Sequence, residues 1–134
     1  MKRRILAMVG VFWLGASAFA QDQAVERQAK GSPDKDIQIG MYINVKPDCT
    51  SGPLPTIRLI SPPEHGRVNV KKANVNATNY KQCLALEVPG YIAFYRSAPS
   101  FSGTDVLTLE IKFPGGRTEV QKITVTIASS NLGL

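Results

Sequence analysis

Apolar and polar residues alternate along most of this chain, and a period of two is the pattern that half-buried β-strands leave in a sequence. The clearest examples are residues 107–113 and 123–127, in which every second residue is Leu, Ile, Val or Phe. Pro114, Gly115 and Gly116 lie between the two segments and predict a turn. We therefore expect two adjacent strands whose alternate apolar residues face a core.

Three shorter segments before residue 71 show the same alternation. Residues 37–45 predict a half-buried strand with Tyr42 on one face and five apolar residues on the other: Ile37, Ile39, Met41, Ile43 and Val45. Residues 56–60 are predicted to place Ile57 and Leu59 inward, and residues 66–70 to place Val68 and Val70 on one side. Prolines between these segments predict turns, because proline cannot donate to a β-ladder.

The remaining segments carry weaker signals. Residues 84–88 and 91–95 are rich in β-forming residues and flank a Pro-Gly pair at 89–90, which predicts a hairpin. Residues 71–82 are polar and rich in Asn and are expected to form a long loop or a ragged edge hairpin. Residues 21–36 lack a sustained apolar period and are expected to be a flexible leader. With no long helical period in these segments, the pattern predicts an all-β sandwich.

The first 20 residues have the features of a cleaved signal peptide. A positive start at 2–4 precedes an apolar stretch at 5–19, and the small residues Ala18 and Ala20 predict cleavage before Gln21. The alternative is an uncleaved transmembrane helix, for which the apolar stretch is short. We expect a soluble periplasmic or secreted protein with no membrane span after cleavage.

Cleavage leaves 114 of the 134 residues, enough for one domain. The expected organisation is a signal peptide at 1–20, the leader at 21–36, a sandwich at 37–128 and a C-terminal tail at 129–134. The net charge of +6 falls to +3 once the signal peptide is removed. Because Lys71 and Lys72 form the only basic pair after residue 20, no nucleic-acid partner is expected.

Cys49 and Cys83 are the two cysteines of the chain, and both lie in the exported part. An even count in an oxidising compartment predicts a structural disulfide between them. The alternative is a redox or metal pair, which lacks a CxxC spacing and has only one histidine to assist it.

The string from Gly90 to Ile111, GYIAFYRSAPSFSGTDVLTLEI, resembles the closing half of a bacterial cadherin-like or immunoglobulin-like repeat. The resemblance extends over about Pro62–Ile127. Its matching positions are an opening at Pro63, Gly66 and Val68, an aromatic strand with Tyr95 and Pro99, and a corner at Phe101, Gly103 and Asp105. It implies an immunoglobulin-like (cadherin-like) antiparallel sandwich of about seven strands. Such repeats also bind calcium between tandem copies. This chain has one copy and no paired carboxylates near its ends, so no metal site is assigned.

Few residues suggest chemistry. His65 could act as a base only beside a nucleophile and an orienting acid. The favoured interpretation is that His65 is an exposed turn residue. Asp105 could be a metal ligand, but tying a turn to backbone amides is favoured. No catalytic residue and no cofactor are assigned. The candidates for partner contact are His65, Lys71, Lys72 and Tyr80. Tyr80 is included because tyrosine combines apolar area with a hydroxyl.

These observations lead to a functional expectation. We expect a monomeric, non-catalytic binding module of the bacterial cell envelope that contacts a protein or a polysaccharide. The alternative is a small disulfide-braced inhibitor of an exported hydrolase, acting through a rigid loop such as Pro47–Pro55 or Pro62–Gly66. A purely structural envelope component is a third reading.

Overall fold

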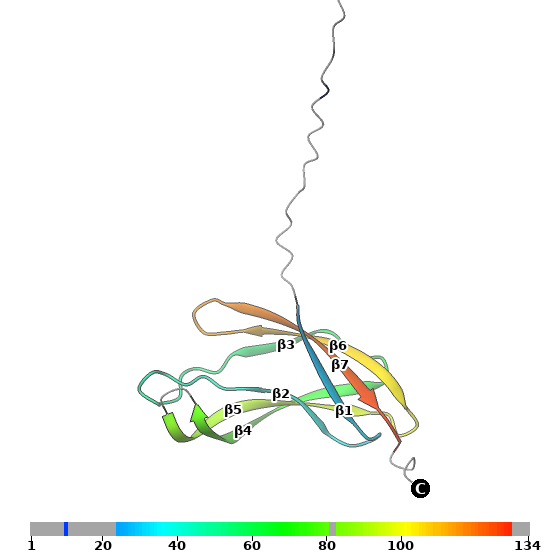
Figure 1. Cartoon of the computed structure of the whole chain (residues 1–134), viewed down its shortest axis with the longest axis horizontal. Coiled ribbons are helices and arrows are strands. Elements are labelled where there is room, and N and C mark those ends of the chain that lie inside the picture. Colours follow the sequence, from blue (N-terminus) through cyan, green and yellow to red (C-terminus); the bar gives the residue numbers. More distant parts are fainter. Residues whose placement is uncertain (1–9, 11–23, 81–82, 130–134) are drawn as a thin grey trace, which may run out of the picture.

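The computed structural model describes residues 10, 24–80 and 83–129, and the predicted signal peptide lies almost wholly outside them. Seven strands form two sheets (Figure 1). Their bounds are β1 Val25–Gly31, β2 Ile37–Tyr42, β3 Thr56–Ser61, β4 Gly66–Tyr80, β5 Cys83–Ser97, β6 Gly103–Lys112 and β7 Thr118–Ile127.

The two sheets form an open sandwich. The four-stranded sheet has the order β1-β7-β6-β3 and the three-stranded sheet the order β2-β5-β4. All pairings are antiparallel except that of β1 with β7, which is parallel. The sequence prediction of an all-β sandwich is confirmed at this level.

The core lies between the sheets and follows the predicted alternation of β6 and β7. Leu107, Leu109 and Ile111 of β6, and Ile123 and Val125 of β7, are at most 1% exposed. Both strands have a neighbour on each side within their sheet, so their inward residues are covered by the opposite sheet. Full burial of such a side chain contributes about 1.5–3 kcal/mol to folding.

The alternation predicted for β2 is wrong after Ile39, because a β-bulge interrupts the strand. The register with β5 shifts between Gln38 and Gly40. One extra residue moves each following side chain to the opposite face. Met41, predicted on the buried face, is 43% exposed, and Tyr42 is 5% exposed. Gly40 allows this packing, since a Cβ there would collide with the ring of Tyr42.

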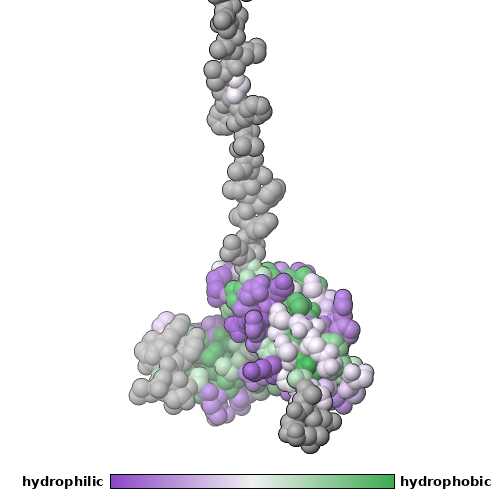
Figure 2. Space-filling view, turned by 45° about the vertical axis from the view of Figure 1, so that its right-hand side comes forward, coloured by the Kyte–Doolittle hydropathy of each residue, from purple (hydrophilic) through white to green (hydrophobic). Residues whose placement is uncertain are grey.

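The inward assignment of Leu59 is also corrected, and Val70, predicted to share a side with Val68, is exposed. Their strands, β3 and β4, are edge strands, and β1 lies against β2 on the other side of the sandwich. Side chains at the open side are incompletely covered, so Leu59 is 39% and Val70 42% exposed. Figure 2 shows hydrophilic and hydrophobic residues intermingled on one face of the molecule.

The predicted flexible leader at 21–36 contains β1, which pairs in register with β7 from Val25↔Gln121 to Gly31↔Ile127. Most β1 side chains are exposed, and Ala29 packs against the core. The strand is therefore held mainly by backbone hydrogen bonds, which leave no hydrophobic period in the sequence.

The predicted turn at Pro89 and Gly90 is wrong, because β5 continues through both residues. Residues 71–80 likewise extend β4, so the predicted loop or edge hairpin is the outer half of a long β4–β5 hairpin. Pairing with β2 ends at Tyr42↔Tyr91, and beyond it β5 is paired only with β4. A proline fits such a strand when its nitrogen faces the unpaired side.

Candidate functional site

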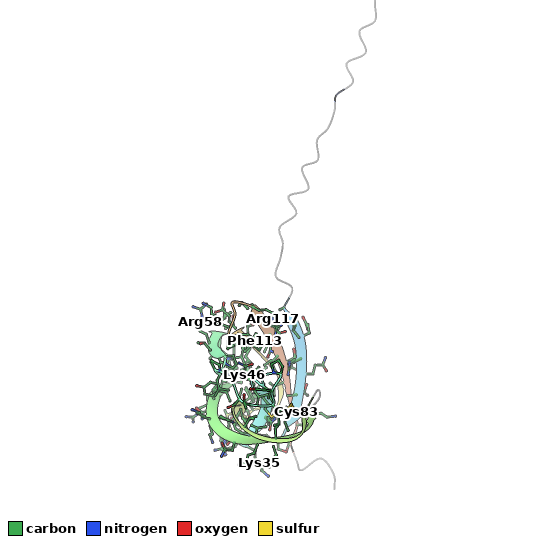
Figure 3. The ribbon with its side chains drawn as sticks, turned by 90° about the vertical axis from the view of Figure 1, so that its left-hand side faces the viewer. Lys35, Lys46, Arg58, Cys83, Phe113 and Arg117 are labelled. Atoms are coloured by element: carbon green, nitrogen blue, oxygen red, sulfur yellow. A yellow bond between two sulfur atoms is a disulfide. The ribbon has the colours of Figure 1, made fainter. Side chains whose placement is uncertain are left out.

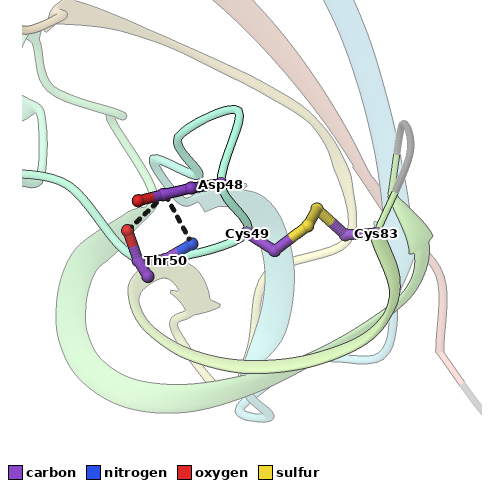
Figure 4. The surroundings of a disulfide bond; sticks show 4 residues. All are labelled: Asp48, Cys49, Thr50 and Cys83. Atoms are coloured by element: carbon purple, nitrogen blue, oxygen red, sulfur yellow. Dashed lines mark hydrogen bonds between the residues drawn. A yellow bond between two sulfur atoms is a disulfide. The ribbon is translucent and has the colours of Figure 1, made fainter.

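The outer half of the hairpin is fastened by a disulfide between Cys49 and Cys83, whose Cα atoms are 5.7 Å apart (Figure 4). The predicted disulfide is confirmed. Cys49 lies in the connection between β2 and β3, so the bond ties this connection to the start of β5. A small cluster surrounds it: Val45, Cys83 and Val88 are buried, and Ile43, Cys49 and Leu86 pack against them.

The connection around Cys49 is itself ordered by hydrogen bonds. Asp48 accepts bonds from the amide and the hydroxyl of Thr50, at 3.1 and 2.6 Å. The side-chain bond from Thr50, followed by the backbone bond, lowers the pKa of Asp48. The disulfide favours an oxidising, extracytoplasmic compartment. Across the described residues, no helix is long and apolar enough to cross a membrane.

Asp105 connects the turn before β4 to the core. It is 3% exposed and accepts hydrogen bonds from the amides of Glu64 and His65, at 3.0 and 2.9 Å, and from the Tyr95 hydroxyl at 2.7 Å. The amide of Val106 donates to it as well, at 3.1 Å. The corner that the resemblance singled out thus ties a turn to backbone amides.

This network shifts two pKa values in opposite directions. Burial raises the pKa of the Tyr95 hydroxyl, and its bond to the Asp105 carboxylate adds to the effect. Burial alone would also raise the pKa of Asp105. The hydrogen bonds that Asp105 accepts, first that of Tyr95, outweigh burial, so its pKa lies below the usual range.

The two other corner residues shape the neighbouring surface. Phe101 stacks on His65, with ring centroids 4.2 Å apart and an interplanar angle of 8°. Gly103 has a φ of 132°, which L side chains rarely adopt. The His65 side chain is 48% exposed. Among the residues that the structure describes, no group of three His, Cys, Asp or Glu side chains could hold a metal ion.

Two adjoining hollows lie where β4 begins and β5 ends. The first, about 300 Å³, is lined by Asp36, Arg67, Asn69, Lys71 and Arg96. The second, about 370 Å³, is lined by Asp34, Glu64, His65, Gly66, Arg67, Arg96, Ser97, Ala98 and Pro99. Both hollows include Arg67 and Arg96. We call all the residues that line the two hollows the Arg67–Arg96 surface.

Charges on this surface are unevenly compensated. Arg67 and Arg96 lie directly opposite each other in the β4–β5 ladder. Asp36 forms salt bridges with Arg96 at 3.2 Å and with Lys71 at 3.9 Å. Within the described chain, Arg67 forms no salt bridge. Like charges directly opposite each other destabilise a sheet, so this pair has a cost to the fold.

Two other arginines on the sandwich, Arg58 and Arg117, have a carboxylate partner. Arg58 pairs with Glu110 at 3.3 Å. Arg117 pairs with Glu119 at 4.0 Å and lies 4.2 Å from the centroid of Phe113 (Figure 3). The Arg67–Arg96 surface differs in that two arginines lie opposite each other on paired strands beside a hollow, which makes it the candidate for recognition of an anion.

Two of the predicted contact residues lie on the Arg67–Arg96 surface, namely His65 in the second hollow and Lys71 in the first. Lys72 follows Lys71 in β4, and successive residues of a strand face opposite sides. The side chain of Tyr80 lies outside what the structure describes. Arg67 was missed although it shares a strand face with Lys71. Arg96 could not be found without the β4–β5 register.

Comparison with known proteins gives no family for this chain, because no family model, no curated protein and no solved structure matches it. Its class is therefore defined by the fold alone. It is a two-sheet, seven-stranded all-β sandwich with a disulfide between Cys49 and Cys83.

Proposed function

We propose that this chain is an exported, non-catalytic interaction module with an immunoglobulin-like sandwich, which contacts a protein or a polysaccharide of the bacterial cell envelope. The observation that carries the proposal is the Arg67–Arg96 surface. It is a hollowed, charged surface on two paired strands, and it contains an arginine with no counter-ion among the described residues. Rigid strands hold binding groups more accurately than loops do.

The strand order supports the immunoglobulin-like part of the proposal. If the strands are lettered A to G in chain order, β2-β5-β4 becomes B-E-D and β7-β6-β3 becomes G-F-C. These strand sets correspond to the two sheets of an immunoglobulin sandwich, except that the first strand pairs with the last one instead of with the second. The corner at Phe101, Gly103 and Asp105 agrees with the same assignment.

The surroundings of His65 support a binding role over a catalytic one. Its imidazole stacks on Phe101 and lies 3.8 Å from the Glu64 carboxylate, and its amide donates to Asp105. These contacts fix the turn. An exposed, preordered aromatic pair beside a charged hollow is suited to binding, because little conformational entropy is lost when a ligand contacts it.

The test is a crosslinking capture from envelope fractions with the tagged exported protein and two charge-reversal variants. Arg67→Glu places a carboxylate opposite Arg96, which favours the sheet while it reverses the charge of the arginine that lacks a counter-ion. Lys30→Glu makes the same change in charge in the other sheet, on β1, where its partner in the β7 ladder is the uncharged Thr126. We expect the partner to be recovered by the wild type and by Lys30→Glu and lost with Arg67→Glu. Equal recovery by all three proteins, or recovery of no partner, contradicts the proposal.

A second candidate function is inhibition of an exported hydrolase through the loop Pro47–Pro55. The observation in its favour is the bracing of this loop by the disulfide, by the Asp48–Thr50 bonds, and by backbone bonds from Cys49 to Lys46 and from Lys46 to Thr50. Stoichiometric inhibition of an envelope protease or cell-wall hydrolase that is lost on replacing the loop would favour this function. Binding that depends on Arg67 and no inhibition would exclude it.

A further inference from the structure

Positive charge on the Arg67–Arg96 surface is concentrated in the first hollow. Three cationic side chains line it, Arg67, Lys71 and Arg96, and Asp36 is its one carboxylate. Cations therefore exceed carboxylates by two in this hollow alone, whereas over both hollows the three cations are matched in number by Asp34, Asp36 and Glu64. Because the Arg67–Arg96 pairing is unfavourable in the free protein, an anion between the two guanidinium groups would relieve a repulsion and add an attraction.

The side chains also define what kind of anion fits. A guanidinium group is planar and donates two parallel hydrogen bonds to a carboxylate, so two arginines select for planar oxyanions. Asn69 adds an amide that can both donate to and accept from hydroxyl groups. A hollow of about 300 Å³ lies at the lower end of the range for small-ligand sites, which suits one sugar-sized unit.

The second hollow is balanced in charge. Its lining adds the carboxylates of Asp34 and Glu64 to the two shared arginines. Carboxylates accept hydrogen bonds from hydroxyl groups and repel a second anion. A ligand that spans both hollows therefore needs an anionic unit in the first and a neutral, hydroxyl-rich unit in the second. A run of acidic residues in a peptide does not meet this condition.

We infer that the Arg67–Arg96 surface binds an acidic polysaccharide in which carboxylate-bearing sugars alternate with neutral ones. The carboxylate of one unit lies between Arg67, Lys71 and Arg96. The adjoining neutral unit presents hydroxyl groups to Asp34 and Glu64 beside the exposed His65 ring. This inference rests on the proposed function and names the partner class of the same surface.

The test is a calorimetric titration of the folded protein with oligosaccharides of equal length. A hyaluronan octasaccharide supplies alternating glucuronate and neutral units, and its carboxyl-reduced form lacks the charge. An alginate octasaccharide carries a carboxylate on every unit, and polyglutamate supplies a purely anionic peptide. We expect the hyaluronan probe to bind more tightly than the other three, with affinity that decreases as salt is raised.

The variants locate the site. Arg67→Glu should weaken binding of the hyaluronan probe at least about tenfold, a ratio set by the loss of one charge-assisted bidentate contact. Lys30→Glu should bind as the wild type does. Glu64→Gln should raise the affinity for the alginate probe relative to that for the hyaluronan probe, because it removes a carboxylate from the second hollow. No binding of the hyaluronan probe at about 1 mM, equal binding of polyglutamate, or full affinity of Arg67→Glu overturns the inference. If Arg67-dependent capture of a protein partner persists in that case, the proposed function stands and only the polysaccharide is excluded.

Discussion

Replacement of Asp105 by asparagine tests whether one buried carboxylate holds the turn before β4 on the sandwich. The carboxylate accepts four hydrogen bonds, two at each oxygen. Oδ1 accepts from the amides of Glu64 and Val106, and Oδ2 accepts from the amide of His65 and the hydroxyl of Tyr95. Asparagine keeps the shape but replaces one acceptor oxygen with a donor.

The expected cost follows from this geometry. If the amide nitrogen replaces Oδ1, the amides of Glu64 and Val106 lose their acceptor; if it replaces Oδ2, the His65 amide loses its acceptor and the Tyr95 hydroxyl must accept instead of donate. Each unsatisfied buried donor costs about 1–3 kcal/mol. The two bonds that remain lose the contribution of the charge. We therefore expect Asp105→Asn to lower the free energy of unfolding by about 3–5 kcal/mol. For a domain whose total stability is about 5–15 kcal/mol, this is a large fraction.

The assay is urea unfolding at neutral and at acidic pH. The pKa of Asp105 is lower in the folded than in the unfolded chain, because the accepted hydrogen bonds outweigh burial. The carboxylate therefore stabilises the fold above its unfolded pKa of about 3.9, and this contribution is lost as the pH falls through the folded value. As the pH is lowered from 5 through the folded pKa of Asp105, the free energy of unfolding should therefore fall less for Asp105→Asn than for the wild type.

A matched control separates the network from general damage to the core. Tyr95→Phe removes one donor and leaves the carboxylate with its three amide partners, so it should cost about 1–2 kcal/mol. It should also keep most of the acid sensitivity. The reasoning is refuted if Asp105→Asn unfolds within about 0.5 kcal/mol of the wild type, or if both proteins lose stability equally in acid.

Three further predictions concern stability and order. Reduction of the disulfide between Cys49 and Cys83, 34 residues apart, should lower the free energy of unfolding by about 4 kcal/mol. In urea titrations, Cys49→Ser should have this lower free energy of unfolding, and reductant should not change it. Gly40→Val should cost about 1–3 kcal/mol by thermal unfolding, because its side chain collides with Tyr42. Hydrogen exchange should show protected amides in Val25–Gly31, and exchange there as fast as in an unfolded peptide would contradict the parallel pairing of β1.

Sequence reasoning succeeded where burial alone determines the pattern. The central strands β6 and β7 are covered by the other sheet, so Leu107, Leu109 and Ile123 alternate visibly with polar residues and are buried as predicted. It failed where backbone geometry overrides composition. The bulge at Gly40 exchanged the faces of Met41 and Tyr42, and such a shift leaves no signal in hydrophobicity.

The other failures have the same kind of cause. Strand β1 joins the sheet through its backbone, and its mostly polar side chains read as a leader. Pro89 was read as a turn because its tolerance in β5 depends on where β2 ends, which is a property of the assembled sheet. The candidate site needed the same information, since Arg67 and Arg96 are 29 positions apart in the sequence and meet only through the β4–β5 register.

The sites of the two candidate functions lie at opposite ends of the long β4–β5 hairpin. At one end, Gly66 pairs with Ser97 beside the Arg67–Arg96 surface. At the other end, Tyr80 pairs with Cys83 at the disulfide. With a rise of about 3.3 Å per residue, Lys71 lies roughly 30 Å along the strand from Tyr80. Pairing with β2 and the main core support the first end, whereas the small cluster at Val45 and the disulfide support the second.

Reduction should therefore loosen the outer half of the hairpin and the loop Pro47–Pro55 while the main core keeps its order. Under mild reductant that leaves the protein folded, binding through the Arg67–Arg96 surface should keep its affinity. Inhibition through the braced loop should be lost, because the loop would regain the conformational freedom that the disulfide removes. Reductant thus distinguishes a module that recognises its partner through paired strands from an inhibitor that acts through a fastened loop.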